Sequence, residues 1–550
     1  FKEAANLPFD AGAAKGSVAA QISAGMPLGK TFSREAVTYA IEADITGFAA
    51  ERFVRGYKAE AASMRVSATQ NLLQVKGDMK IAGTATAVEY RKARNDPEAE
   101  LRVQSTLDDA ARGRLGFDVG NALGGPVAVK LSGRMRSLDK DGSRLLVEAD
   151  LTQAKVLDLL PGWVKPAGKA ARSSFTVVDR GPTTRLEDFV IEGSGAAVRG
   201  AIEIDAQGDI VQAEFPTFTL SDGDKATLKA ERATDGTLKV TLRGDVYDGR
   251  GLFKTAVAGQ KPDQKAKRPQ DMDIDLKLGT ITGHHGEALR AVELRMSRRA
   301  GQVKSFTLTG KLGAEGYVTG DLRGRGGNAR QVIYVESNDA GALFRLTDTY
   351  ARLVGGWMSV AMDPPNADNA PQDGLLNIRD FSVRGESALD RVATTNQSTD
   401  GNERGAARAY GNNYDGVSFS RMRVEFTKSP GKFAIRDGVV WGPMLGATLD
   451  GSLDYFRDEV RLRGTLVPAY GINNMFSRLP VIGMLLGGGV NEGLLGITYQ
   501  VVGSTASPTL QVNPMSVVAP GFLRKIFEFR GGEERPPERT GQAPLSPSPR

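Results

Sequence analysis

The chain has 550 residues, with 71 lysines and arginines against 65 aspartates and glutamates, and a formal net charge of +6. Because both signs are interleaved throughout, this small excess argues against a nucleic-acid-binding surface and indicates a solvated polar face. Cysteine is absent, which excludes disulfides, thiol catalysis and thiolate metal sites, and no stretch reaches the ~18 apolar residues of a membrane helix. Glycine, at 66 residues, exceeds the usual ~7% and suits many short strands joined by turns.

Residues 1–330 are dominated by short runs in which apolar and polar residues alternate. Segments 201–205 and 238–243 alternate in this way, and in the segment 271–278 four apolar residues alternate with Asp and Lys. Alternation with a period of two predicts strands with one buried face. Asp–Gly pairs punctuate the runs and predict tight turns, at 141–142, 222–223, 235–236 and 248–249. The pattern favours antiparallel meanders over βαβ units.

A sheet that keeps one apolar face over so many strands must bury that face against something. A second sheet, closure into barrels, or a curled trough would each serve, but a simple sandwich is too small for this length. We therefore predict a mainly β protein. It would have a long curled antiparallel sheet or serial barrel-like β modules forming an apolar groove, with a few short capping helices.

Three segments have the spacing of short helices that plug or cap the sheet, or that contact a membrane or a partner. They are 155–160, ended by Pro161 and Gly162; 339–354, with Asp339 as the N-cap and Gly355–Gly356 as the stop; and 471–486, which Pro480 kinks. In the third segment the apolar residues share one helical face and predict a C-terminal cap or outlet, formed by Ile472, Met475, Phe476, Leu479, Ile482 and Leu486.

Several blocks near the C-terminus carry a family resemblance. VPAYGINN, LPVIGMLLGGG, EGLLGITYQVVGS and PGFLRKIF in 467–527, together with FAIRDGVVWGPMLGATLDGSLDY at 433–455 and DAGALFRLTDTYARLVGG at 339–356, resemble the C-terminal region of the AsmA-like family. The likeness is greatest to its long YhdP-type branch, a group of bridge-like bacterial lipid transport proteins. The resemblance implies a groove-shaped β protein of the periplasm, anchored to the inner membrane, that carries phospholipid toward the outer membrane.

The resemblance and the composition together predict three parts. Residues 1–330 form a repetitive β-sheet groove region, and 331–530 form an AsmA-like C-terminal region with its capping helices. Residues 531–550 form a disordered, proline-rich tail. Because Phe1 opens directly into a globular pattern, we expect a piece of a longer chain. The membrane anchor would then lie in an N-terminal segment outside this chain.

Residues suited to catalysis or metal binding are scarce. His284 and His285 are the only histidines, and in an extended segment adjacent side chains point to opposite faces, so we interpret them as a turn pair. Carboxylates are plentiful but lie at alternating, solvent-type positions. We therefore expect no catalytic residue, no metal and no cofactor, and rank a carbohydrate-active or hydrolytic enzyme last.

The leading hypothesis is a non-enzymatic protein that shelters phospholipid acyl chains between the inner and outer membranes of a Gram-negative envelope. The alternative is a structural or scaffold β protein of the envelope that binds other proteins and carries no lipid. Expected partners are phospholipids, the two membrane surfaces and other envelope proteins, with no nucleic acid. The candidate groove residues are Met272, Ile274, Leu276, Leu278, Val460, Leu462, Leu466, Ile497, Tyr499 and Val501.

Overall fold

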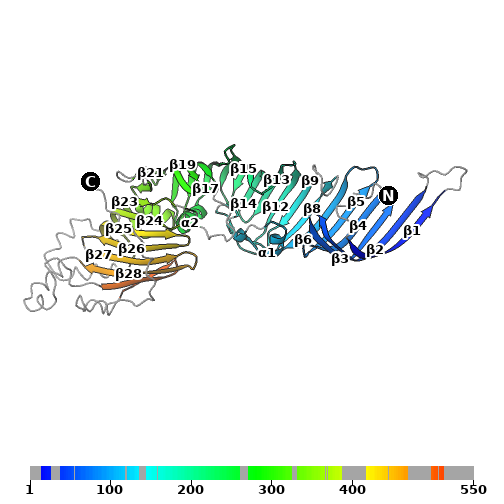
Figure 1. Ribbon diagram of the computed structural model, residues 1–550. Helices are drawn as coiled ribbons and strands as arrows, with labels where there is room; N and C mark the ends of the chain where they lie inside the picture. The colour runs from blue at the N-terminus through cyan, green and yellow to red at the C-terminus, as the bar shows by residue number, and fades with distance from the viewer. Residues whose placement is uncertain are drawn as a thin grey trace, which may run out of the picture. The chain divides into compact units, whose positions relative to one another are not determined.

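The computed structural model confirms the predicted fold class. Strands hold 70% and helices 6%, in a long antiparallel sheet that is not closed into a barrel (Figure 1). The chain divides into two compact units, unit 1 up to Tyr247 and unit 2 from Asp248. The structure describes residues 14–26, 37–54, 56–117, 120–135, 144–157, 159–160, 162–259, 271–324, 331–365, 367, 370–386, 416–443, 445–468, 497–505 and 507–512.

Unit 1 contains an antiparallel meander in which each strand pairs with the next strand of the same sheet in chain order, while a few short strands of unit 1 form a separate sheet. Among its described residues no pair joins the first strand to the last, so this part of the sheet is open. The strands are β1 (Lys15–Gly25), β2 (Thr38–Val54), β3 (Tyr57–Thr69), β4 (Leu72–Ile81), β5 (Thr84–Ala93), β6 (Ala99–Leu107), β8 (Val127–Met135), β9 (Arg144–Asp150), β12 (Ala171–Asp179), β13 (Thr183–Gly193), β14 (Ala196–Asp205), β15 (Ile210–Thr219), β16 (Lys225–Arg232) and β17 (Leu238–Asp248).

Unit 2 repeats the same arrangement, again with neighbours in sequence paired as neighbours in the sheet. The strands are β18 (Met272–Thr282), β19 (Ala288–Arg299), β20 (Gln302–Leu312), β21 (Gly316–Gly324), β22 (Gln331–Ser337), β23 (Leu353–Met362), β24 (Gln372–Val383), β25 (Val417–Ser429), β26 (Lys432–Trp441), β27 (Leu445–Asp454), β28 (Glu459–Pro468), β29 (Ile497–Gly503) and β30 (Pro508–Val512). The domain boundary predicted near residue 330 falls inside this unit and stays a prediction.

Bulges and glycines curl the sheet. The register shifts between Leu186 and Phe189 in β13 and between Ile435 and Gly438 in β26, and each shift bends its strand and increases the local twist. At Gly200 in β14 an added Cβ would lie only 1.9 Å from the Glu214 carbonyl oxygen of β15. Only glycine permits so close an approach of two strands, so this position acts as a kink.

Unit 1 also contains a small substructure outside the main sheet, and two buried cations hold it together. It consists of α1 (Asp109–Arg114), η4 (Gly120–Ala122) and a three-stranded sheet of β7 (Leu123–Gly124), β10 (Lys155–Leu157) and β11 (Val164–Lys165). The Lys165 ammonium is 0% exposed and donates to four backbone carbonyls, those of Ala154 at 2.7 Å, Pro166 and Lys169 at 3.0 Å, and Thr152 at 3.3 Å.

Arg112 in α1 is buried as well, and its guanidinium donates to the carbonyls of Leu107, Leu123 and Gly125 at 2.7–3.0 Å. The two cations thus donate to backbone carbonyls where loops and strand ends meet. The helix predicted at 155–160 is wrong, because Lys155–Leu157 is strand β10. Val156 in that strand is fully buried and pairs with both Leu123 and Lys165, so pairing and burial overrode the apolar run.

In unit 2 the predicted helix at 339–354 is confirmed in its first half only. Helix α3 (Ala340–Leu346) begins at Asp339, whose side chain accepts a hydrogen bond from the Ala342 amide at 2.9 Å. The helix ends at Thr347, and Leu353 and Val354 already belong to β23. A further helix, α2 (Arg250–Ala258), starts at Gly249, where the sequence predicted only a turn. The 471–486 segment and the 531–550 tail lie outside the described residues.

Candidate apolar groove

An unbroken line of apolar residues crosses unit 1 at right angles to its strands. Each member lies directly opposite the next across a strand pair, so all of them stand on one face of the sheet. With strands ~4.8 Å apart, the line is roughly 58 Å long. We call it row A: Ala43, Val66, Val75, Tyr90, Leu101, Gly133, Leu145, Val177, Leu186, Ile202, Ala213, Ala230 and Val240.

A second line, row B, runs beside row A two residues along each strand. Direct pairing carries it from β2 to β12, through Ile45, Met64, Gly77, Val88, Val103, Leu131, Val147 and Phe175. Beyond the bulge in β13 aromatic contacts continue it. The rings of Phe175 and Phe189 stack at 5.8 Å, and those of Phe189 and Phe215 meet edge to face at 5.9 Å. Leu228 and Leu242 complete the row.

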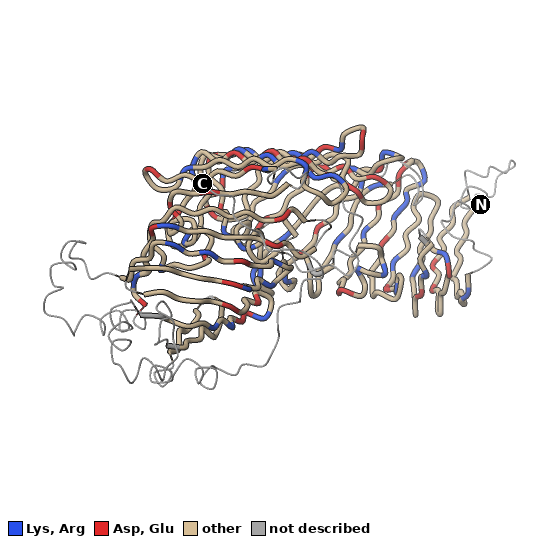
Figure 2. The backbone as a smooth tube through the Cα atoms, turned by 60° about the vertical axis from the view of Figure 1, so that its left-hand side comes forward, with Lys and Arg blue, Asp and Glu red and all other residues tan. Residues whose placement is uncertain are grey.

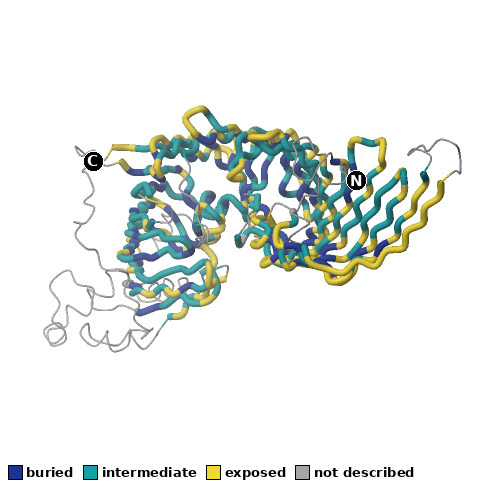
Figure 3. Tube along the Cα trace, turned by 45° about the vertical axis from the view of Figure 1, so that its right-hand side comes forward, coloured by how far each residue is buried: buried dark blue, intermediate teal, exposed yellow. Residues whose placement is uncertain are grey.

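Rows A and B are only half buried over most of their length, whereas the row on one side of them is closed. Val88, Val103, Leu131, Val147 and Phe175 in row B are all half-exposed in the described structure. The closed row, row C, contains nine paired residues of which most are buried: Met79, Thr86, Ser105, Val129, Ala149, Ser173, Ile191, Val198 and Phe218. Unit 1 therefore has an apolar band that is buried along one margin and half-exposed over most of its length. Figure 3 shows the buried residues of these strands gathered toward one end of the strands.

Unit 2 has the same construction. Row D, half-buried at most of its leucines and valines, crosses β18 to β27 through Leu276, Leu294, Leu308, Gly320, Val335, Val360, Leu376, Val424, Gly438 and Leu449. Row E runs beside it through Ile333, Met362, Gly374, Phe426, Ile435, Gly451, Leu462, Val501 and Leu510.

Helix α3 covers the margin of the unit 2 sheet that lies beside row D on the side away from row E. Its buried Ala340 and its neighbours Leu343 and Phe344 pack against a core of Met358, Ile378 and other residues from successive strands. Arg345 holds the helix in place, with ion-pair contacts of 2.8 Å to Glu287 and a hydrogen bond of 3.0 Å to the Leu353 carbonyl. The sequence prediction that this helix caps the sheet agrees with these contacts.

The opposite face of the sheet is charged. Asp44, Arg65, Lys76, Glu89 and Arg102 lie opposite one another on β2 to β6, one residue away from the apolar rows. Figure 2 shows basic and acidic residues interspersed with other residues along the strands. The apolar rows are therefore the lining of a face and not the core of a two-sided sandwich within these strands.

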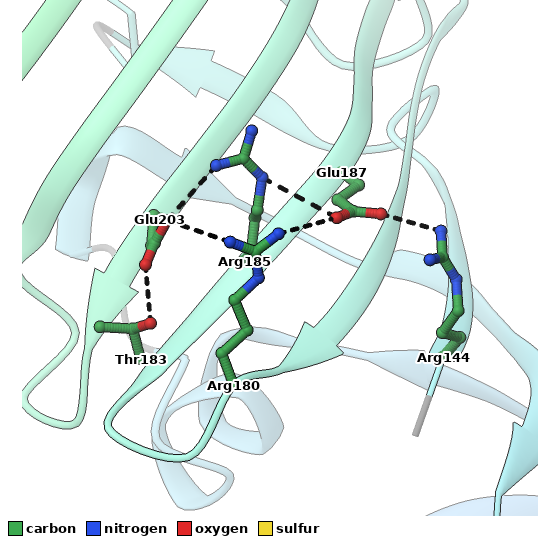
Figure 4. Close-up of polar contacts among 6 residues, drawn as sticks. All are labelled: Arg144, Arg180, Thr183, Arg185, Glu187 and Glu203. Carbon is green, nitrogen blue, oxygen red and sulfur yellow. Dashed lines mark hydrogen bonds and ion pairs between the residues drawn. The ribbon is translucent and has the colours of Figure 1, made fainter. Parts of the chain in front are cut away.

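Figure 4 shows one network on this charged face, across β9, β13 and β14. Glu187 pairs with Arg144 at 2.8 Å and with Arg180 at 3.3 Å, while Glu203 pairs with Arg185 at 3.3 Å. Leu186 of row A lies between Arg185 and Glu187 in the sequence and so projects to the other face. Exposed pairs of this kind stabilise by at most about 1 kcal/mol each, so the network keeps this face solvated and in register more than it strengthens the fold.

The structure places the predicted groove residues on the apolar face of unit 2. Ile274, Leu276 and Leu278 of β18 lie opposite Met296, Leu294 and Val292 of β19. In the C-terminal pair, Leu466 lies opposite Ile497 and Leu462 opposite Val501. Their exposure differs, however. Leu278, Val460, Leu466 and Tyr499 are buried packing residues, whereas Met272, Ile274, Leu276, Leu462 and Val501 are half-exposed.

Tyr499 illustrates a packing role. Its hydroxyl donates to the Thr448 carbonyl at 2.7 Å, and burial raises the pKa of its phenol. It therefore fixes β29 against β27 and presents no polar group to a ligand. Met272, opposite Arg298, lies at the end of its strand. The predicted cap residues from Ile472 to Leu486 lie outside the described residues.

Sequence reasoning did not identify rows A and B as a site. Their signal was present, because Ile202, Val240 and Leu242 belong to the alternating segments 201–205 and 238–243, which are confirmed as parts of β14 and β17. Alternation marks one face of one strand. The alignment of that face across thirteen strands depends on register and bulges, which the pattern leaves open.

The histidine pair forms a turn, as predicted. His285 has a positive φ of 53°, and its Nε2 lies 2.7 Å from Asp348 Oδ1, which ties the β18–β19 turn to the end of α3. Within the described ranges no group of three or more histidine, aspartate or glutamate side chains could hold a metal ion. No helix in the same ranges is long and apolar enough to cross a membrane.

Comparison with protein-family models, with curated proteins and with solved structures found no match to this chain. The class of molecule is therefore defined by its geometry alone. It is an open antiparallel β protein whose units each carry a long, half-exposed apolar band backed by a charged, solvated face.

Proposed function

We propose that the protein shelters the acyl chains of phospholipids along its apolar bands and lets them move across the strands without chemical change. The observation that carries the proposal is the register-matched continuity of row A, in which each residue from β2 to β17 lies directly opposite an apolar or glycine residue on the next strand, with row B beside it. A continuous band offers a hydrocarbon chain a similar environment at every step.

The driving force is the cost of exposing hydrocarbon to water, about 0.8 kcal/mol for each CH₂ group. Membrane hydrocarbon is ~30 Å thick, so one acyl chain needs roughly half that length. Row A, at roughly 58 Å, is several times longer than one chain. Half-exposed residues suit this role because they contact the chain while leaving the headgroup free to stay in water.

The wider setting is part of the same proposal and is supported by the resemblance of the C-terminal blocks to the AsmA-like family. In this setting the protein acts in the periplasm, anchored to the inner membrane by a segment outside this chain, and moves phospholipid between the inner and outer membranes. No catalytic step and no cofactor enter this account.

A matched pair of variants tests the proposal on one strand. Val103→Glu puts a carboxylate into row B between Val88 and Leu131, whereas Gln104→Glu puts the same group on the exposed opposite face. Burying a carboxylate beneath an acyl chain is strongly unfavourable. We expect Val103→Glu to weaken binding of a fluorescent phospholipid at least tenfold, equivalent to about 1.4 kcal/mol, and Gln104→Glu to leave it unchanged.

Circular dichroism of both variants checks that each is folded. Native mass spectrometry of the unmodified chain after purification should also find bound phospholipid. A folded chain that carries no lipid and takes up none when it is added would contradict the proposal and favour the scaffold alternative. Equal binding by the two variants would show that lipid does not lie along row B.

A further inference from the structure

A row of two tryptophans and two arginines crosses unit 2 on the face opposite its apolar rows. Trp357 of β23 lies directly opposite Arg379 of β24. Arg379 also lies opposite Arg421 of β25, which in turn lies opposite Trp441 of β26. We call these four residues the Trp–Arg row. It spans three strand spacings of ~4.8 Å, roughly 14 Å, and contains two of the 3 tryptophans of the chain.

The side chains of the Trp–Arg row project away from the core of unit 2. Each is adjacent in sequence to a residue that packs in or against that core, and successive residues of a strand point to opposite faces. These core residues are Met358, Ile378, Met422 and Val440. Both arginines are exposed, Trp441 is 46% exposed, and Trp357 is half-exposed. The row therefore presents its rings and guanidinium groups to solvent.

The two arginines of the row face a like charge and lack an acidic partner. Like charges directly opposite each other destabilise a strand pair. Among the described residues neither guanidinium forms an ion pair, although the exposed Asp380 follows Arg379 in the sequence. At other positions of the sheet, directly opposed charges are matched in ion pairs of 2.6–2.9 Å: Lys229 with Glu214, Lys277 with Glu293, and Arg463 with Asp450. The fold gains nothing from two unmatched cations side by side, which points to a ligand that supplies the negative charge.

The tryptophan rings orient the two guanidinium groups. The Arg379 Cζ lies 5.4 Å from the centre of the Trp357 ring, and the Arg421 Cζ lies 6.0 Å from the centre of the Trp441 ring. Both distances are within the ~6 Å range of cation–π contacts. Such a contact leaves the N–H groups of the guanidinium available to donate, and their fork matches the oxygens of a phosphate.

This combination of side chains fits the surface of an anionic bilayer. Arginine donates two parallel hydrogen bonds to a phosphate, and the indole ring favours the headgroup level of a membrane, because one end of the ring is apolar and the other is polar. Each arginine near an anionic membrane surface strengthens binding about fivefold. A single phosphate ion would engage the two central arginines and leave the outer rings without contact, whereas a bilayer surface meets all four residues.

We propose that the Trp–Arg row binds the phosphate headgroups of anionic phospholipids at a bilayer surface. The unmatched charge of the arginines and the flanking indole rings carry the proposal. It does not rest on acyl-chain binding by the apolar bands, because the row lies on the opposite face of the sheet.

Flotation of the full chain with lipid vesicles tests the proposal. One set of vesicles contains phosphatidylcholine alone, and the other contains phosphatidylcholine with an equal amount of phosphatidylglycerol. We expect the chain to float with the anionic vesicles only, and the double variant Arg379→Gln with Arg421→Gln to bind them at least tenfold more weakly. The matched control is Arg91→Gln with Arg102→Gln, which removes two exposed arginines from the charged face of unit 1, where each faces a glutamate. It changes the net charge equally and should leave vesicle binding unchanged.

Tryptophan fluorescence provides a second measurement that reports on the row itself. The remaining tryptophan, Trp163, is 1% exposed, so brominated phospholipid in the anionic vesicles should quench the emission of Trp357 and Trp441. The double variant Arg379→Gln with Arg421→Gln should lose this quenching while its circular dichroism stays that of the folded chain.

Three outcomes would overturn the proposal. Vesicle binding that survives in the double variant would place the membrane contact elsewhere on the chain. An equal loss of binding in the control variant would show that net charge, and not the Trp–Arg row, governs binding. A folded chain that binds inorganic phosphate but no vesicles would assign the row to a soluble phosphate compound.

Discussion

Leu276 and Leu278 provide a test of the distinction between half-exposed residues that line the apolar face and buried residues that pack the core. Both lie on β18, both point to the apolar face, and the sequence predicted the same role for each. In the structure Leu278 is 1% exposed and faces the buried Val292, whereas Leu276 in row D is half-exposed and faces Leu294. Truncating each to alanine removes the same atoms from two different surroundings.

The expected magnitudes follow from burial. Leu→Ala at a fully buried site leaves a cavity and costs 2–5 kcal/mol, so Leu278→Ala should lower the free energy of unfolding by about 3 kcal/mol. Leu276 loses less contact in the protein, and Leu276→Ala should cost about 1 kcal/mol. If row D binds acyl chains, the effects on lipid affinity have the opposite order. Leu276→Ala should weaken lipid binding more than Leu278→Ala, since only Leu276 presents its side chain to a ligand.

Urea denaturation followed by circular dichroism measures the first quantity, and titration with a fluorescent phospholipid measures the second. We expect Leu278→Ala to be the less stable variant with near-normal lipid affinity, and Leu276→Ala to be nearly as stable as the unmodified chain with weaker affinity. Equal losses of stability at the two positions would refute the assignment of Leu276 to a lining surface. Weaker lipid binding by Leu278→Ala alone would refute the assignment of lining residues by exposure.

Three further predictions concern the scaffold. Lys165→Met removes the ammonium that donates to four backbone carbonyls, among which that of Thr152 keeps the Gly168 amide as a donor, and should lower the free energy of unfolding by about 3 kcal/mol in urea. Gly374→Ala places a Cβ 2.3 Å from the ring of the buried Phe426 and should cost about 2 kcal/mol, whereas Gly324→Ala, with open space around it, should cost nothing in the same assay. Hydrogen bonds from the Thr505 and Ser504 hydroxyls lower the pKa of Asp458 below its ordinary value of 3.8, so this carboxylate stabilises the fold above that pH and the contribution is lost as the pH falls through the lowered pKa. Asp458→Asn should therefore lower the melting temperature at pH 7, and the difference from the unmodified chain should disappear in acid; a difference that persists there would contradict it.

The strands were predictable because, in a sheet with one buried face, apolar and polar residues alternate along each strand. In 238–243, for example, Leu238, Val240 and Leu242 point one way and Lys239 and Arg243 the other. The run at 155–160 failed for the opposite reason. A short apolar stretch suits a helix or a strand, and only its pairing with Leu123 and Lys165 decided between them.

The candidate site was less predictable than the fold. A slip of one residue between two strands would turn a whole apolar set to the solvated face, and the bulges that set the register, such as that near Phe189, leave no clear sequence signal. The buried cations Arg112 and Lys165 also resembled ordinary surface residues. Their role depends on carbonyls brought together from several parts of the chain.

Pairing in chain order has a consequence for how such a sheet can change in length. Because each strand contacts its neighbours in the order of the chain, insertion of one hairpin adds two strands without altering the pairs on either side of it, and the even number preserves the direction of every following strand. Each such insertion would lengthen the band by about 10 Å. The same locality keeps contacts short in sequence, which favours rapid folding from any starting hairpin. The length of a sheet of this kind can thus change by duplication of hairpins, with no redesign of the existing strands.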